Sequence, residues 1–265
     1  MNTEKPNVLI ELPHGGNLIP SEVCPYIDKS FTADDMRRDA DEFSDEIFYK
    51  LDVPHQMVRS DFWRAFIDVN RSIDNRGSDG VVKTNTSQGI QIYKSEDGLP
   101  PDIADLVIEK HVRPYRERFL AALGQPEITQ LIMCHTMPGM GTQNSLAEDP
   151  GTYRPLFSLI NEGDEHGNTP EGHPFASGQR IHLVGDIIRK HIPNFDTDFK
   201  YSEALTYNFP YNNFSRAREF DISHYEGKNA FSFEVNRNLF HHNLGNVAAM
   251  RALMVEIVSK LSEQG

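Results

Sequence analysis

Short apolar runs separated by polar turns recur along the chain and predict β-strands. Six such runs, most of them of the length of a buried strand, lie at residues 8–12, 57–59, 65–69, 130–134, 156–160 and 230–235. Longer stretches with helical periodicity lie at residues 34–51, 102–123, 178–191 and 244–262. Strands that alternate with helices of this length are typical of an α/β fold with a mixed, mostly parallel central sheet flanked by helices.

The predicted elements belong to a single domain, because no repeat, low-complexity tract or long linker divides residues 1–265. Pro114 falls inside the helical stretch 102–123. Since a proline removes a backbone donor and crowds the preceding turn, we expect this helix to be broken there. Residues 161–178 contain two prolines and lack periodicity, which predicts a long loop. Loops of this length are solvated connections more often than lids over a site.

Composition argues against a membrane protein and against an exported one. Hydrophobic residues make up 38% of the chain, but no uninterrupted apolar stretch reaches the ~18 residues that a membrane span requires. The N-terminus offers neither a basic segment nor a sufficiently long apolar run for export, so we expect a cytoplasmic protein with no membrane partner. The two cysteines, Cys24 and Cys134, form neither a disulfide framework nor a thiolate metal motif, which agrees with a reducing compartment.

The net charge argues against nucleic acid as a partner. Lys and Arg number 26 against 39 Asp and Glu, which gives a net charge of −13 and no broad field to attract a phosphate backbone. The same field repels a small anionic substrate, so such a substrate needs a local group of arginines. Arg64, Asn70 and Arg71 are candidates, because a guanidinium can hold a carboxylate through two parallel hydrogen bonds. An internal ion pair between Asp68 and Arg71 is the alternative.

Three predicted strands end in side chains that bind metals or move protons. His14 follows the first strand, His135 follows the run at 130–134, and Glu234 lies in the last strand. In an open α/β sheet, ligands bind beyond the carboxyl ends of the strands, so these side chains can converge although they are far apart in sequence. Two imidazoles and one carboxylate leave an open coordination position, which is the ligand set of a catalytic zinc ion. Each histidine taken alone is more often a structural residue that bonds a backbone carbonyl.

Acidic residues in the helical stretch 34–51 supply carboxylates for a third ligand. Asp39 and Asp41 are candidates, although acids in the first turns of a helix also complement its dipole. Glu234 is a different kind of candidate, because it alternates with apolar neighbours and projects from the polar face of its strand. A carboxylate there can take a proton from water beside a metal and pass it to a leaving amine. An ion pair of Glu234 with Arg237 or another cation is the alternative.

Six short segments stand in a definite order along the chain. They are Pro13-His14-Gly15-Gly16, Asp39-x-Asp41-x-x-x-Asp45, Arg64-x-x-x-Asp68-Val69-Asn70-Arg71, Cys134-His135-Thr136-Met137, Asn208-Phe209-Pro210-Tyr211 and Phe233-Glu234-Val235-Asn236-Arg237-Asn238-Leu239-Phe240. Each segment is a weak signal alone, but together, from about residue 8 to residue 240, they are specific at the level of a family. In these segments the chain resembles the N-formylglutamate amidohydrolase family.

The resemblance implies a phosphorylase/hydrolase-like α/β fold, akin to that of the zinc carboxypeptidases, and metal-dependent hydrolysis of an N-acyl amino acid. It implies that His14 and His135 are zinc ligands and that Glu234 is the general base. For the third ligand it favours Asp39 over Asp41, because the family pattern places an acid at the first position more regularly.

The resemblance also implies a clamp for the substrate. Asn70 and Arg71 are similar to the pair that holds the substrate carboxylate in the wider carboxypeptidase-like group, and we expect Arg64 to assist them. The chain departs from the family pattern at Met133, where the family usually has an acid, and at residues 212–213, where it usually has two glycines. The first departure concerns the surroundings of the second histidine, and the second concerns the identity of the substrate.

These expectations together predict a zinc-dependent amidohydrolase, with one Zn²⁺ or another divalent ion per chain. Its substrate is a small anionic N-acyl amino acid, foremost N-formyl-L-glutamate, which it converts to formate and L-glutamate. Two alternatives stay open. A peptidoglycan or peptide amidase would use the same ligands on a larger substrate, and a metal-free binding protein would keep the fold and the arginines without turnover.

Overall fold

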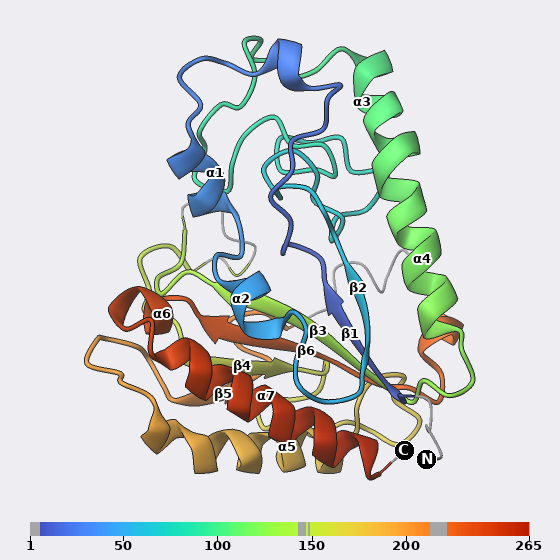
Figure 1. Cartoon of the computed structure of the whole chain (residues 1–265), viewed down its shortest axis with the longest axis vertical. Coiled ribbons are helices and arrows are strands. Elements are labelled where there is room, and N and C mark those ends of the chain that lie inside the picture. The colour runs from blue at the N-terminus through green and yellow to red at the C-terminus, as the bar shows by residue number, and fades with distance from the viewer. Residues whose placement is uncertain (1–5, 143–146, 148, 213–221, 265) are drawn as a thin grey trace.

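A six-stranded sheet runs through the centre of the protein (Figure 1). The structure is a computed structural model, and it describes residues 6–142, 147, 149–212 and 222–264. The strands are β1 (Val8–Leu12), β2 (Gln56–Arg59), β3 (Gln130–Met137), β4 (Phe157–Ile160), β5 (Leu205–Tyr207) and β6 (Asn229–Asn236). Their order is β2-β1-β3-β6-β4-β5, and every neighbouring pair is parallel except β4 with β6. The predicted α/β class with a mostly parallel sheet is confirmed.

Helices cover both faces of this sheet (Figure 1). They are α1 (Ala33–Asp39), α2 (Ser44–Phe48), α3 (Pro101–Val107), α4 (Arg113–Leu123), α5 (Gly178–His191), α6 (Asn238–His242) and α7 (Asn246–Ser262). Short 3₁₀ turns lie at Cys24–Tyr26, Ile192–Asn194 and Ile222–Tyr225. Helices α2 and α5 both pack against α7, and the three share one hydrophobic core, whereas α3 and α4 belong to the core on the other side. Among the described residues, no helix combines the length and the apolar composition that crossing a bilayer requires.

The two cores follow from the alternation of side chains along the strands. In β1, Ile10 packs with the α5 and α7 side chains, and its neighbour Leu9 packs with those of α4. In β6, Phe231 and Phe233 lie in the first core and Ala230 in the second. Because successive side chains of a strand point to opposite faces, each buried strand contributes to both cores.

The predicted helix 34–51 is two helices with a break between them. Helix α1 begins with a capping box in which the side chains of Thr32 and Asp35 each accept a hydrogen bond from the other residue's backbone N–H. It ends at Asp39, because the next residue, Ala40, is extended. Phe43 then adopts a left-handed conformation with a φ of 68°, and α2 starts after it.

Three further details differ from the sequence prediction. The helix 102–123 is not broken at Pro114, because a π-helical turn (Ile108–Val112) joins α3 to α4 and this wider turn lets the helix continue past the proline. Residues 65–69 are buried but form turns, with the backbone N–H of Asp68 donating to Val81 O. Strand β5 was not predicted, since it has three residues and pairs with a strand more than 40 positions away.

Candidate metal centre and active site

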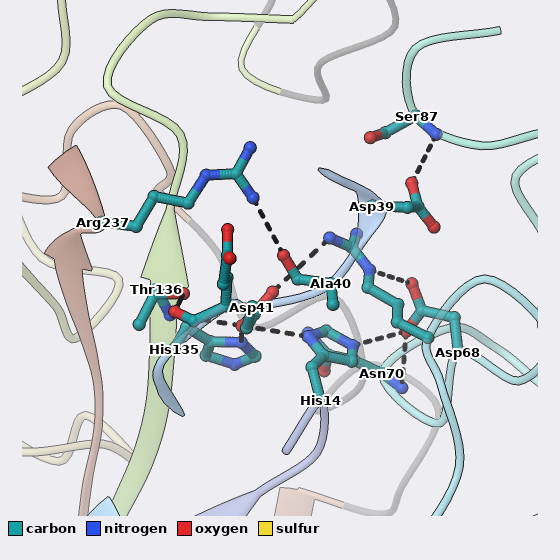
Figure 2. Close-up of polar contacts among 12 residues, drawn as sticks. His14, Asp39, Ala40, Asp41, Asp68, Asn70, Ser87, His135, Thr136 and Arg237 are labelled. Carbon is teal, nitrogen blue, oxygen red and sulfur yellow. Dashed lines mark hydrogen bonds and ion pairs between the residues drawn. The ribbon is translucent and has the colours of Figure 1, made fainter. Parts of the chain in front are cut away.

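Three buried side chains from distant parts of the chain meet beyond the carboxyl ends of the parallel strands (Figure 2). Oδ2 of Asp41 lies 2.9 Å from Nδ1 of His135 and 3.2 Å from Nδ1 of His14. The two imidazole rings have centroids 5.1 Å apart and are tilted by 58°. In the part of the chain that the structure describes, these residues offer ligand atoms within 4.8 Å of one another and could hold a metal ion.

The sheet topology brings these residues together. His14 follows β1 by two residues, and His135 lies near the end of the neighbouring parallel strand β3. Asp41 comes from the break between α1 and α2, just after the extended residue Ala40. The backbone N–H of Thr136 donates to Oδ2 of Asp41 at 3.3 Å, which ties the break to β3.

A glycine two residues after His14 lets the chain pack closely against another backbone segment. A Cβ atom on Gly16 would lie 2.2 Å from the carbonyl carbon of Asp61 and 2.3 Å from the nitrogen of Phe62. Residues 17–18 then donate two backbone hydrogen bonds to the carbonyl of Asp61, at 3.1 and 2.9 Å. The glycine therefore permits the close packing of two backbone segments next to the first histidine.

A buried carboxylate fixes the orientation of the first histidine. Nε2 of His14 lies 2.8 Å from Oδ1 of Asp68, whose side chain is fully buried. A carboxylate accepts hydrogen bonds, so Nε2 donates and Nδ1 keeps its lone pair in the neutral ring. That Nδ1 is buried and has no hydrogen-bond partner among the described residues. Histidines that bind metals commonly donate their second ring N–H to a carboxylate in this way.

The geometry of the three side chains fits a divalent cation such as zinc. Ligand atoms about 2.0–2.1 Å from a tetrahedral zinc ion are separated by about 3.3 Å. The separations from Asp41, 2.9 and 3.2 Å, are close to that value. Two imidazole nitrogens and a carboxylate oxygen are also the donor set of catalytic zinc sites, in which one further position stays open. A cation would therefore give the buried Nδ1 of His14 the partner that it lacks among the described residues.

Asp39, which we expected to be the third ligand, does not reach the histidines. Its carboxylate accepts hydrogen bonds from Nζ of Lys83 at 2.8 and 3.2 Å and from the backbone N–H of Ser87 at 2.6 Å. Helix α1 ends at Asp39, and the extended backbone after it carries Asp41 to the histidines instead. The expectation for Asp39 is therefore corrected, and the acid that faces both histidines is Asp41.

Glu234 lies next to this cluster in the sheet. It is the register partner of His135 in the parallel pair of β3 and β6, so the two side chains leave the sheet on the same side. Only 8% of Glu234 is exposed. Burial raises the pKa of Glu234 to about 7, although the positive charges of His135 and Arg154 oppose this shift. A carboxyl group with such a pKa can exchange protons at neutral pH.

The residues that we expected to bind substrate lie around Asp68. Nε of Arg64 donates to Asp68 at 3.0 Å, and the backbone N–H of Asn70 donates to the other oxygen, also at 3.0 Å. Nε of Arg71 lies 3.7 Å from Asp68, but its shorter contacts go to the carbonyl and the carboxylate of Asp79, at 3.1 and 2.6 Å. Of the two arginine side chains, Arg64 is 20% exposed and Arg71 only 9%. Arg64 is thus the more accessible cation beside the cluster.

Arg237 has a different role from the ion pair with Glu234 that we considered. Its guanidinium donates to the carbonyl of Ala40 at 3.0 Å (Figure 2) and to that of Arg38 at 3.2 and 3.3 Å. Both carbonyls lie just before Asp41, so the residue that follows β6 holds the segment that carries the one acid of the cluster.

Sequence reasoning did not find Arg154, a buried cation whose charge acts on Glu234. Its guanidinium makes a bidentate contact with Asp149 at 2.8 and 2.9 Å and donates to the hydroxyl of Tyr211 at 2.7 Å. Burial raises the pKa of Tyr211 to about 12, so its hydroxyl stays protonated at neutral pH. Tyr211 is the last residue of one of the six family segments, so that segment was the one sequence signal that pointed to the surroundings of Arg154. Of the departures at 212–213, residue 213 lies outside the described part of the chain.

The sheet and the buried His-Asp-His cluster define an α/β protein with a candidate metal-dependent active site. The chain belongs to the N-formylglutamate amidohydrolase family, whose model matches residues 7–240. Among solved structures, it is similar to an N-formylglutamate amidohydrolase from Ralstonia eutropha JMP134, with a TM-score of 0.70 and 19% identity over 99% of this chain and 95% of that one. A gene product of Agrobacterium tumefaciens is also similar, with a TM-score of 0.57 and 15% identity over 97% and 90% of the two chains. No match is found among curated proteins.

Proposed function

We propose that this member of an amidohydrolase family hydrolyses the amide bond of an anionic N-acyl amino acid, foremost N-formyl-L-glutamate, with the help of a divalent cation. The observation that carries the proposal is the buried cluster of His14, Asp41 and His135, in which one ring nitrogen has no hydrogen-bond partner among the described residues. Membership of the N-formylglutamate amidohydrolase family supports the class of reaction.

The cluster would hold the cation through two ring nitrogens and one carboxylate oxygen, a donor set that suits Zn²⁺. When bound, the ion would act as a Lewis acid toward the amide carbonyl and would make nearby water more acidic. Asp68 keeps Nε2 of His14 protonated, so that the lone pair of Nδ1 stays directed at the cation position.

Glu234 is the proposed general base and acid. Its carboxylate takes the proton of the attacking water as the oxygen adds to the amide carbon. The same group then delivers that proton to the departing nitrogen as the C–N bond breaks. A pKa of about 7 suits both steps, because the group can lose and regain a proton near neutral pH. The products are the carboxylic acid, formate for a formyl group, and the free amino acid.

Arginines beside the cluster supply the positive charge that an anionic substrate needs in order to bind to a negatively charged protein. The chain carries a net charge of −13, so a carboxylate needs local positive charge to bind. We propose that Arg64, together with Asn70 and Arg71, holds the substrate carboxylate and so orients the amide over the cation position. The greater exposure of Arg64 makes it the first of these to meet the substrate.

The test is a hydrolysis panel with N-formyl, N-acetyl and N-carbamoyl derivatives of Glu, Asp and Gln, each measured with and without a chelator. We expect turnover of a formylated acidic amino acid, loss of that turnover with the chelator and its return with Zn²⁺. Glu234→Gln should bind Zn²⁺ as wild type does but lose about 10²- to 10⁴-fold in kcat. Turnover that is indifferent to the chelator would overturn the metal-dependent mechanism. Zinc binding without turnover of any compound would favour a binding protein.

A further inference from the structure

A fully buried lysine joins two parts of the site that are far apart in the sequence. The side chain of Lys83 has no exposed surface, and its Nζ lies 2.8 Å from Oδ2 of Asp39 and 2.8 Å from Oδ1 of Asp79. An ammonium group is costly to bury unless it is paired. The two carboxylates therefore determine where this lysine sits, and the lysine in turn holds them at a set separation.

One side of this bridge reaches the segment of the metal cluster. Asp39 is the last residue of α1 and precedes Asp41 by two positions. Its Oδ1 also accepts from the backbone N–H of Ser87 at 2.6 Å, so the carboxylate is held from two directions. Since only Ala40 lies between the two acids, a shift of Asp39 would move the carboxylate that faces the histidines.

The other side of the bridge reaches the expected substrate clamp. Asp79 directs one carboxylate oxygen to Lys83 and the other to Nη2 of Arg71, at 2.8 and 2.6 Å. The backbone carbonyl of Asp79 accepts from Nε of Arg71 at 3.1 Å. The guanidinium of Arg71 is thus held by a residue that Lys83 itself anchors.

We propose that Lys83 is a positioning residue that sets the placement of the Asp41 segment relative to Arg71. This inference rests on the proposed function, because it concerns the cation and the substrate carboxylate of that same site. Lys83 would touch neither of them and would act through Asp39 on one side and through Asp79 on the other.

A purely electrostatic effect and a positioning effect would change the Zn²⁺ affinity and the KM in opposite directions, so the inference can be tested. Removal of a positive charge near a cation site strengthens cation binding if charge is the only effect. If position matters, Lys83→Met instead weakens Zn²⁺ binding, by about tenfold, which is within the range for residues that orient metal ligands. Asp79→Asn removes a negative charge, so charge alone would lower the KM for an anionic substrate. Loss of position instead raises that KM, by about threefold or more.

Zn²⁺ affinity is measured by competition with a chromophoric chelator, which needs no turnover, and KM is measured on the zinc-loaded protein with the best substrate of the panel. Lys83→Met leaves the buried carboxylate of Asp39 and the partly exposed carboxylate of Asp79 without their shared cation and can fail to fold. The double variant Lys83→Met/Asp39→Asn keeps the charge balance of the buried cluster, and we expect the same tenfold loss of Zn²⁺ affinity from it. Lys190→Met is the matched control, because Lys190 pairs with Glu256 on the surface. We expect it to bind Zn²⁺ as wild type does.

The outcomes separate this inference from the proposed function. If the wild-type chain binds no divalent cation and hydrolyses no compound of the panel, the proposed function itself fails. If the wild type does both, but the folded Lys83 variants bind Zn²⁺ as tightly as wild type or more tightly, the positioning role is overturned and the proposed function stands. A KM for Asp79→Asn at or below that of the wild type would equally overturn the link to Arg71.

Discussion

Replacement of Arg237 by methionine tests how firmly the segment before Asp41 is held. Arg237 is 9% exposed and donates three hydrogen bonds, two to the carbonyl of Arg38 and one to that of Ala40. The last carbonyls of a helix have no partner within the helix, and here the guanidinium supplies one. Methionine keeps much of the side-chain volume but donates no hydrogen bond.

The loss of stability follows from these contacts. A hydrogen bond from a charged donor contributes about 1.5 kcal/mol or more, and two carbonyl acceptors lose theirs, which gives about 3 kcal/mol. Part of this cost is returned, because methionine removes the desolvation cost of a buried guanidinium, the same burial that lowers the pKa of Arg237. We therefore expect a net loss of about 2 kcal/mol in the free energy of unfolding. For a chain of this size, that lowers the Tm by about 4–8 °C.

Arg251 offers a matched control that is partly exposed to solvent. It also donates three hydrogen bonds to backbone carbonyls, those of Glu46, Tyr49 and Lys50, at 2.7 to 2.9 Å. Water can replace the lost donor there, so Arg251→Met should cost only about 0.5 kcal/mol. The assay is urea unfolding with a chelator present, so that no bound ion adds to the stability. Equal losses for the two variants would refute the reasoning from burial.

Three further predictions concern the site. As the proposed base, Glu234 acts only when ionised, so kcat/KM should fall as the pH drops through about 7, or somewhat below because a bound cation favours the carboxylate. A fall in kcat/KM that already begins above about pH 8 as the pH is lowered would contradict this. Asp68→Asn puts an amide opposite Nε2 of His14, so Zn²⁺ affinity should fall about 10- to 100-fold in a chelator competition; unchanged affinity would remove Asp68 from the site. Gly16→Ala forces a Cβ against the backbone of Asp61 and should cost about 1–3 kcal/mol in urea unfolding, whereas a neutral result would mean that the backbone yields freely.

Periodicity predicted the elements whose burial follows a regular pattern. The strands at 8–12, 130–134 and 230–235 were found because their runs of apolar side chains are buried along their whole length. Residues 65–69 are also mostly apolar, but they are buried in the core that contains the α3 and α4 side chains and make no strand ladder. A short apolar run therefore shows that a segment is buried, but it does not show whether the segment pairs as a strand.

The candidate site was predictable as far as it depends on the sheet. His14, His135 and Glu234 lie at or near the ends of neighbouring parallel strands, and that topology alone brings them together. The choice between Asp39 and Asp41 depends instead on Lys83, a residue more than 40 positions further along the chain. No local sequence pattern indicates such a long-range contact. The sequence therefore predicts that this acidic segment supplies the ligand, but it does not distinguish Asp39 from Asp41.

The surroundings of Asp41 and Glu234 explain why two buried carboxylates of one site can take different roles. Burial alone would raise the pKa of Asp41, but the electrostatic attraction of the adjacent His14 and the hydrogen bond with His135 outweigh it and hold that pKa well below its usual range. At Glu234, burial prevails and raises the pKa to about 7. When the surroundings move the pKa values of two carboxyl groups apart in this way, one group stays ionised and the other can take up a proton at neutral pH. A ligand must stay ionised and a base must exchange its proton, so the surroundings support Asp41 as the proposed ligand and Glu234 as the proposed base.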